Sequence, residues 1–188
     1  MEEKNKVAKK HRLPKEYLLN VGTVEERKNV LAVVKAIRNI DTHLVIVGGS
    51  TPYTTEVLNY IAENKMESKV LFIKNLNSKE LAIIYQLATL FVYTSIFEGF
   101  GIPIIVALYS KTPVIATKNG VFPEAGGPDS IYIDSNNIEE IEGKIIYLLS
   151  NPILRLEIAA QGHQFVQKFN DQNIATEVMK VYKTILNF

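Results

Sequence analysis

The chain has 188 residues, of which 47% are hydrophobic and 22% are charged, and 21 Lys and Arg residues against 20 Asp and Glu residues give a formal net charge of +1. A chain of this size suits one compact domain that buries about 70% of its unfolded surface, so its core needs neither disulfides nor a metal. The absence of cysteine excludes a disulfide framework and a thiolate metal site. The near-neutral charge argues against binding dominated by attraction to nucleic acid or to an anionic membrane.

The first residues differ in composition from the rest. Residues 2–12 (EEKNKVAKKHR) are highly charged, and Pro14 separates them from the strand-like run YLLNV. This pattern favours a charged tail or interdomain linker over residues 1–15 and a folded domain over residues 16–188. No stretch approaches the ~20 apolar residues of a membrane-spanning helix, and the start lacks the apolar core of a secretory signal, so we expect a cytoplasmic protein.

From residue 17 onward, short apolar runs alternate with longer segments of helical period. Strands are expected at residues 17–21, 44–47, 69–73, 90–93, 114–116 and 130–133. Helices are expected between them at residues 28–38, 54–64, 78–88 and 101–110, and after them at residues 138–149, 152–169 and 171–186. Repeated strand, helix, strand units predict an α/β fold, with a doubly wound parallel sheet of about six strands and extra C-terminal helices.

Two helices carry further signals. Ser78, followed by Glu80 and an apolar stripe, is typical of an N-cap at the start of its helix. The last expected helix has apolar residues at helical spacing that either pack on the domain or form an unpaired stripe, namely Ile174, Val178, Val181, Tyr182 and Ile185.

Polar loops follow the expected strands, on the rim where open parallel sheets bind ligands. Gly22 and the pair Gly48 and Gly49 permit close backbone approach, and Arg27 and Lys28 add cationic donors at a helix start. Together these residues can hold a diphosphate; alternatively, the glycines only close turns and the cations are solvated.

Neither GxGxxG nor GxxxxGK[ST] is present, which disfavours a dinucleotide oxidoreductase and a P-loop kinase.

The segment from Glu98 to Pro103 (EGFGIP) follows an expected strand and opens an apolar helix. Free N–H groups at such a helix start favour a negatively charged ligand. A carboxylate at position 98 would repel phosphate in direct contact, but it can accept hydrogen bonds from hydroxyl groups. The combination therefore suits a sugar attached to a diphosphate, whereas the alternative is an ordinary loop carboxylate.

Five segments in order along the chain resemble one family: VGTVEERKN from Val21, LVIVGG from Leu44, VLFIKNLNSKEL from Val70, SIFEGFGIP from Ser95 and TPVIAT from Thr112. Across about residues 16–186 the chain resembles the C-terminal, donor-binding lobe of retaining glycosyltransferases with the two-lobed GT-B fold, the glycosyl transferases group 1 family. The resemblance implies a Rossmann-like lobe, a nucleoside diphosphate sugar as substrate and no metal or other cofactor. It also implies an acceptor-binding N-terminal lobe absent from this chain, so the isolated chain is expected to be inactive.

The resemblance assigns roles to individual residues. Arg27 and Lys28 match the residues that neutralise the donor diphosphate, and Glu98 matches the catalytic acidic residue that contacts the donor sugar. Lys74, Asn75 and Leu76 match the loop that holds the base. The full set predicted to bind the donor is Gly22, Thr23, Arg27, Lys28, Gly48, Gly49, Lys74, Asn75, Leu76, Gly99, Phe100, Gly101, Ile102 and the position of Val106.

Two positions depart from the family pattern. The family usually has a second glutamate eight positions after the first, which accepts from the ribose, and this chain has Val106 there, which cannot accept a hydrogen bond. Members often carry Arg directly after the first-strand glycine, where this chain has Thr23, although Arg27 can compensate. Losing one charge-assisted contact costs about 1.5–3 kcal/mol, so either the donor is held differently or this copy is impaired.

Other functions and residues stay open at this stage. A non-catalytic nucleotide-sugar binding module and a partner-docking domain with a vestigial crevice are the alternatives to an enzyme lobe. Lys118 and Glu124 either lie near the sugar or belong to a solvated loop, and three scattered histidines (His11, His43 and His163) suggest no metal cluster. We expect no nucleic-acid partner, and peripheral membrane contact only through the absent lobe.

Overall fold

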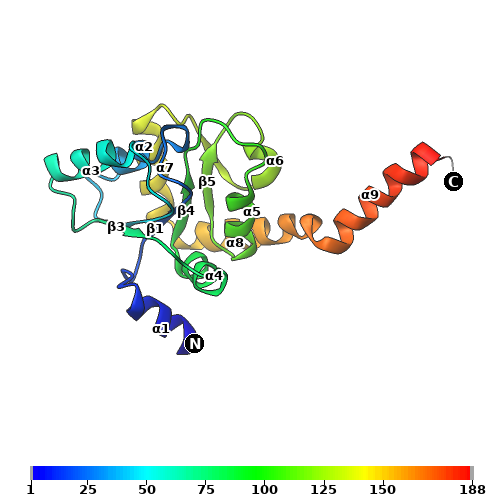
Figure 1. Ribbon diagram of the computed structural model, residues 1–188, viewed down its shortest axis with the longest axis horizontal. Helices are drawn as coiled ribbons and strands as arrows, with labels where there is room; N and C mark the ends of the chain where they lie inside the picture. The colour runs from blue at the N-terminus through cyan, green and yellow to red at the C-terminus, as the bar shows by residue number, and fades with distance from the viewer. Residues whose placement is uncertain (1, 187–188) are drawn as a thin grey trace.

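A six-stranded parallel sheet forms the centre of the protein in a computed structural model that describes residues 2–186 (Figure 1). Its strands are β1 (Leu18–Val21), β2 (Leu44–Val47), β3 (Val70–Ile73), β4 (Leu90–Tyr93), β5 (Val114–Thr117) and β6 (Ile131–Ile133). They lie in the order β3-β2-β1-β4-β5-β6, and every neighbouring pair is parallel. The predicted doubly wound α/β fold is confirmed, and each strand matches its expected bounds to within one residue.

Helices alternate with the strands. They are α1 (Glu2–Lys10), α2 (Val30–Ala36), α3 (Thr54–Glu63), α4 (Ser78–Leu87), α5 (Ile102–Tyr109), α6 (Phe122–Gly126), α7 (Ile138–Leu149), α8 (Pro152–Val166) and α9 (Asp171–Leu186), with the short 3-10 helices η1 (Glu26–Lys28) and η2 (Gln167–Phe169). Within residues 2–186, no helix is long and apolar enough to cross a membrane.

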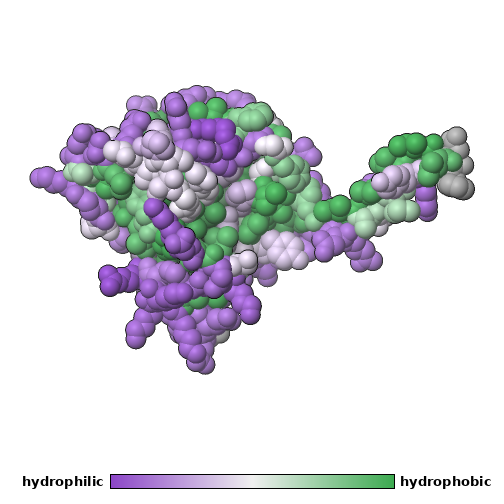
Figure 2. Space-filling view, viewed as in Figure 1, coloured by the Kyte–Doolittle hydropathy of each residue, from purple (hydrophilic) through white to green (hydrophobic). Residues whose placement is uncertain are grey.

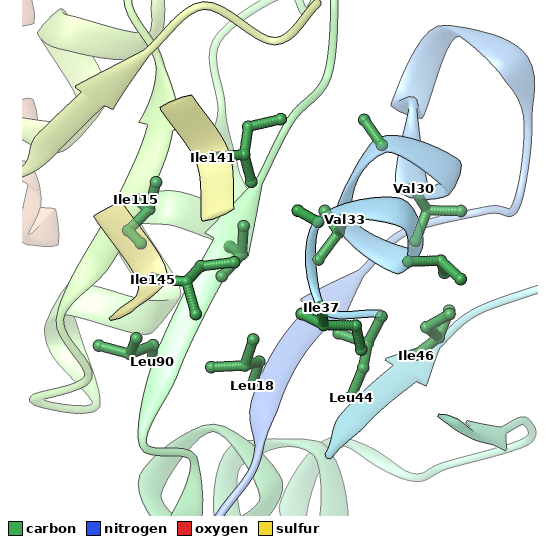
Figure 3. Close-up of a cluster of buried hydrophobic side chains, with 14 of the residues drawn as sticks. Leu18, Val30, Val33, Ile37, Leu44, Ile46, Leu90, Ile115, Ile141 and Ile145 are labelled. Carbon is green, nitrogen blue, oxygen red and sulfur yellow. The ribbon is translucent and has the colours of Figure 1, made fainter. Parts of the chain in front are cut away.

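The core has two halves, one on each face of the sheet. Residues that alternate along a strand point to opposite faces, so Leu44 and Ile46 of β2 face α2 and α7, whereas Val45 and Val47 face α4 and α5. Figure 3 shows the first half, where Val33 of α2 and Ile145 of α7 approach the sheet from above Leu18 and Leu90. The strands are continuous apolar runs because both faces are covered.

The order of the strands places one pair of loops at a special position. β1 lies between β2 and β4, so the connections run outward in one direction from β1 to β3 and in the other from β4 to β6. In such sheets ligands bind outside the carboxyl ends of the strands at the point where the direction reverses. The loops that follow β1 and β4 therefore border the expected crevice.

The charged N-terminal run is helical over Glu2–Lys10, which its tail-like composition did not predict. Val7 is buried against the sheet domain, and the ammonium of Lys10 lies 2.5 Å from the carboxylate of Glu80 on α4, with the ring of His11 at 3.1 Å. Hydrogen bonds from Lys10 and His11 lower the pKa of Glu80 to about 2. Contacts with a distant part of the sequence thus fix α1, and composition alone does not reveal them.

Two further details correct the expectations. The N-cap of α4 is Asn77 and not Ser78: the Asn77 side chain accepts from the N–H of Glu80 at 2.9 Å, and Glu80 accepts from the N–H of Asn77. Helix α6 was expected as part of a loop. It contains only five residues, two of them Pro and Gly, so it lacks the periodic pattern by which helices are recognised.

The C-terminal helix α9 projects from the body of the protein (Figure 1). Within the described length of α9 no side chain is buried, and Figure 2 shows hydrophobic residues along it. The five apolar residues predicted on this helix all have exposed fractions between 47% and 70%. Of the two arrangements considered, the structure contains the unpaired stripe.

The capping assignment gives the first prediction. Asn77→Ala should lower the free energy of unfolding by about 1 kcal/mol, because it removes the acceptor of the capping box. Ser78→Ala is the matched control and should change it by less than about 0.5 kcal/mol. Urea unfolding of both variants measures the difference. A larger loss of unfolding free energy for Ser78→Ala than for Asn77→Ala contradicts Asn77 as the N-cap.

Candidate donor-binding site

Hydrogen bonds join the loops that follow β1 and β4. The carbonyl of Arg27 accepts from the N–H of Ile96 at 2.9 Å, and the hydroxyl of Ser95 lies 3.2 Å from the same oxygen. The hydroxyl of Thr94 donates to the carbonyl of Asn29 at 2.9 Å. Loops that are about 70 residues apart in sequence therefore form one unit at the reversal point of the sheet.

Glu98 lies at the centre of this unit. Its Oε1 contacts the ammonium of Lys28 and accepts from the hydroxyls of Tyr93 and Ser95, both at 2.7 Å. Its Oε2 lies 3.1 Å from the guanidinium of Arg27. The structure thus brings together three predicted residues, Arg27, Lys28 and Glu98, as an ion cluster.

The cluster holds Glu98 in its charged form. Burial by itself raises the pKa of a carboxyl group, but the hydrogen bonds from Lys28, Ser95, Tyr93 and Arg27 outweigh it and lower the pKa of Glu98 to about 2. The side chains of Lys28 and Glu98 are 14% and 13% exposed, so solvent screens this pair only partly. Arg27 is more exposed and also pairs with Glu25 at 2.7 Å.

A cavity of about 360 Å³ lies beside the cluster. Seven of the predicted donor-binding residues line it, together with Val21, Val47 and Leu81: Gly22, Thr23, Gly48, Gly49, Lys74, Asn75 and Leu76. Lys28 adjoins it, because the Lys28 side chain lies 3.5 Å from where a Cβ of Gly22 would be. Glu98 and Arg27 are not among the lining residues, so the predicted site consists of a cavity and a neighbouring ion cluster.

The backbone at Gly48 lies too close to the loop after β1 for a residue with a side chain. A Cβ at Gly48 would lie 1.9 Å from the carbonyl oxygen of Gly22, so only glycine lets the loops after β1 and β2 meet. At Gly49 a Cβ would meet nothing within 4 Å. Asn75 has a positive φ of 58°, a conformation that asparagine tolerates better than most residues, and it turns the loop after β3 toward the cavity.

The residues from Gly99 to Ile102 connect the cluster to α5. Gly101 has φ of 95° at the N-cap of α5, and Ile102 begins the helix. The first N–H groups of a helix have no partner inside it, so an anion-binding role for the start of α5 stays a prediction. Phe100 packs edge-to-face on Phe169 with ring centroids 5.5 Å apart. These residues do not line the cavity.

The positions that depart from the family pattern have different surroundings. Val106 lies on the second turn of α5, where it packs against the buried cluster beneath that helix and does not line the cavity. Thr23 is exposed and lines the cavity, whereas Arg27 points to Glu98.

The secondary candidates lie outside the cluster. Lys118 pairs with Asp134 at 3.3 Å, and Glu124 is an exposed residue of α6. His11 contacts Glu80, and His163 contacts the carbonyl of Tyr109 at 3.0 Å. Among residues 2–186 there is no group of three or more His, Cys, Asp or Glu side chains that is placed to hold a metal ion.

Tyr93 also belongs to the cluster, although the sequence did not predict it as a site residue. Its hydroxyl accepts from Lys28 Nζ at 2.9 Å and donates to Glu98. Tyr93 is the last residue of an otherwise apolar run, and the sequence pattern predicts only that it ends a strand. Its position directly before the loop that contains Glu98 is the signal that can identify such a residue.

The chain is similar in sequence to known proteins. The family model described as "Glycosyl transferases group 1" matches residues 1–165. The chain is 27% identical over 175 residues to O-antigen chain mannosyltransferase B of Escherichia coli, and the match covers 90% of this chain and 46% of that protein.

Solved structures show the same architecture. The crystal structure of the C-terminal domain of a glycosyl transferase group 1 family protein (LpcC) from Francisella tularensis aligns with a TM-score of 0.77 and 25% identity, covering 89% of this chain and 93% of that one. HepE of Anabaena, solved with UDP and glucose, aligns with a TM-score of 0.88 and 16% identity over 97% of this chain and 52% of that one.

The chain therefore belongs to the glycosyl transferases group 1 family, and its fold is that of one Rossmann-like lobe of a GT-B glycosyltransferase. It spans about half the length of the curated relatives that it matches. The resemblance recognised from the five sequence segments is confirmed.

The contact between the loops after β1 and β2 gives a prediction of stability. Gly48→Ala should lower the free energy of unfolding by about 3 kcal/mol or more, because the obstructing atom is a backbone oxygen that cannot move alone. Gly49→Ala, with open space around the new methyl group, should cost less than about 1 kcal/mol. Denaturant unfolding distinguishes the two, and equal losses contradict the proposed close approach.

The low pKa of Glu98 predicts how the stability of the fold changes with pH. The pKa of Glu98 is about 2 in the folded protein and about 4.3 for an unperturbed glutamate, so its ion pairs stabilise the fold fully above that higher value. This stabilisation is lost progressively as the pH falls toward 2. Wild type should therefore be more stable than Glu98→Gln at pH 6, and the gap should narrow steadily from about pH 4.5 to pH 2.5.

Thermal unfolding across this range measures the gap. Glu25→Gln is the control. Among residues 2–186, Glu25 forms an ion pair only with the exposed Arg27, so its removal should leave most of the pH dependence in place. A gap between wild type and Glu98→Gln that does not change with pH contradicts the ion cluster as described.

Proposed function

We propose that this chain is the donor-binding part of a glycosyltransferase that transfers a sugar from a nucleoside diphosphate sugar to an acceptor hydroxyl, with retention at the anomeric carbon. The observation that carries the proposal is the cluster of Arg27, Lys28 and Glu98 next to a glycine-lined cavity at the reversal point of the sheet. Membership of the family and the likeness to a mannosyltransferase support a sugar as the transferred group.

In this proposal the two cations bind the diphosphate of the donor. When the glycosidic bond breaks, negative charge grows on the leaving diphosphate, and cations fixed beforehand stabilise that charge without reorganisation. The N–H groups at the start of α5, from Phe100 to Ile102, add partial positive charge from the helix. No step needs a metal, and we propose a reaction without one.

In this proposal Glu98 binds the donor sugar. A carboxylate with a depressed pKa remains an acceptor at neutral pH, so it can bind sugar hydroxyls next to the bound diphosphate. The nucleobase then occupies the cavity, where Lys74, Asn75 and Leu76 form one wall and the glycines form another. HepE, whose structure contains UDP and glucose, provides a precedent on the same fold.

Val106 makes the donor contacts of this chain incomplete by comparison with the family pattern. Valine offers no acceptor to the ribose, so we propose that binding depends more on the diphosphate contacts of Arg27 and Lys28 than it does in members with the second glutamate. Removal of these two cations is therefore the most informative change.

Acceptor recognition lies outside the proposed role of this chain. Because the chain spans about half the length of its relatives, we propose that an N-terminal lobe supplies the acceptor-binding residues and that the isolated chain binds donor without transferring its sugar. A cytoplasmic location is part of the same proposal.

Calorimetric titration tests the donor-binding role. The chain should bind at least one of UDP, GDP and their glucose and mannose derivatives. The double variant Arg27→Ala with Lys28→Ala should bind at least tenfold more weakly, since each lost charge-assisted hydrogen bond costs about 1.5–3 kcal/mol.

The matched control is Arg38→Ala, which removes an exposed cation near the opposite end of α2 and should leave the affinity unchanged. Binding by wild type that survives the double substitution contradicts the diphosphate role of the two cations. No binding of any of the six compounds contradicts the donor-binding function and favours a partner-docking domain.

A further inference from the structure

Tyr93 occupies a rigid position at the end of β4. Its side chain is 1% exposed, and its ring stacks on Phe91 with centroids 5.6 Å apart and meets Phe122 edge-to-face at 6.1 Å. Two aromatic neighbours in different directions prevent the ring from swinging. The hydroxyl of Tyr93 is therefore fixed relative to the sheet, unlike the long side chains of Lys28 and Arg27.

The hydroxyl bridges the two oppositely charged groups of the site. An ammonium group can only donate and a carboxylate can only accept, so the hydroxyl accepts from Lys28 at 2.9 Å and donates its proton to Glu98 at 2.7 Å. Burial raises the pKa of Tyr93, and the nearby charge of Glu98 raises it further. The proton given to Glu98 thus stays in place across the working pH range.

The charges of the cluster balance one another. Arg27 and Lys28 face the carboxylates of Glu98 and Glu25. A bound diphosphate competes for both cations, because its charge is larger than that of one carboxylate. Glu98 then loses its cationic partners at the moment when the sugar arrives, and its remaining donors are the hydroxyls of Tyr93 and Ser95.

Of these two donors, Tyr93 is the more firmly placed. The hydroxyl of Ser95 also lies 3.2 Å from the carbonyl of Arg27 and 3.3 Å from that of Phe97, so its single proton has other acceptors. The hydroxyl of Tyr93 donates only to Glu98 among the hydrogen bonds of residues 2–186.

We propose that Tyr93 is a positioning residue, which holds the Glu98 carboxylate toward the donor sugar after the diphosphate has drawn Lys28 and Arg27 away. The inference rests on the proposed function and deepens it, because it separates the residue that orients Glu98 from the residues that bind the diphosphate. Tyr93 touches neither the sugar nor the phosphates in this scheme.

The test compares Tyr93→Phe with wild type in titrations with a nucleoside diphosphate and with the corresponding nucleoside diphosphate sugar. UDP with UDP-glucose and GDP with GDP-mannose are the two pairs, and the pair that wild type binds more tightly is used. Tyr93→Phe should bind the nucleoside diphosphate within about threefold of wild type. It should bind the sugar-bearing compound at least tenfold more weakly than wild type, since the lost bond is to a charged group.

Tyr17→Phe is the matched control. Tyr17 is also 1% exposed, and its hydroxyl donates to the carbonyl of Ile84 at 2.6 Å, so the substitution removes one buried tyrosine hydrogen bond outside the site. It should lower the melting temperature without changing the ratio between the two affinities. That ratio separates a positioning role from a loss of stability.

The outcomes are distinct. A selective loss of the sugar-bearing ligand in Tyr93→Phe, absent in Tyr17→Phe, supports the inference. If wild type binds both ligands and Tyr93→Phe weakens them equally or neither, the inference is wrong while the donor-binding function stands. If wild type binds neither ligand, both are wrong.

Discussion

The ion cluster around Glu98 is the interaction on which the proposed site depends. It joins a loop that follows β1 to a loop that follows β4, and these strands are neighbours only because the order of the sheet reverses there. A carboxylate that is mostly buried needs compensation for its lost hydration, and four donors supply it. In the proposed function, the groups that join the two loops are also those that bind the nucleoside diphosphate sugar, so donor binding would be coupled to the order of these loops.

Most of the sheet could be predicted because its strands are short apolar runs bounded by glycine and polar residues. Such runs lack an alternating pattern because helices cover both faces of the sheet, and their short length and bounding residues distinguish them from buried helices. Helix α1 was not predicted because its stability comes from Val7 and from Lys10 contacting Glu80, which lies 70 residues away. Helix α6 is too short for a period, and the cap of α4 is displaced by one residue because Asn77 and Ser78 are both good capping residues.

The sequence indicated several residues that gather at the candidate site, but it did not indicate the contacts between them. Spacing and resemblance indicated Arg27, Lys28 and Glu98, but not that these residues pair with one another. Such pairing depends on the distance between side chains from separate loops, which sequence does not specify. Tyr93 was missed for a related reason, since its neighbours in β4 are all buried. The apolar ring of a tyrosine can pack in the core while its hydroxyl forms hydrogen bonds in the site.

Helix α8 connects the two halves of the core. Ile158 belongs to the half that contains α2 and α7, whereas Val166, two turns later, belongs to the half that contains α4 and α5. Loss of packing in either layer therefore removes contacts from a helix that the other layer shares. Thermal melting should accordingly be a single cooperative event, in which the two sides of the sheet come apart together.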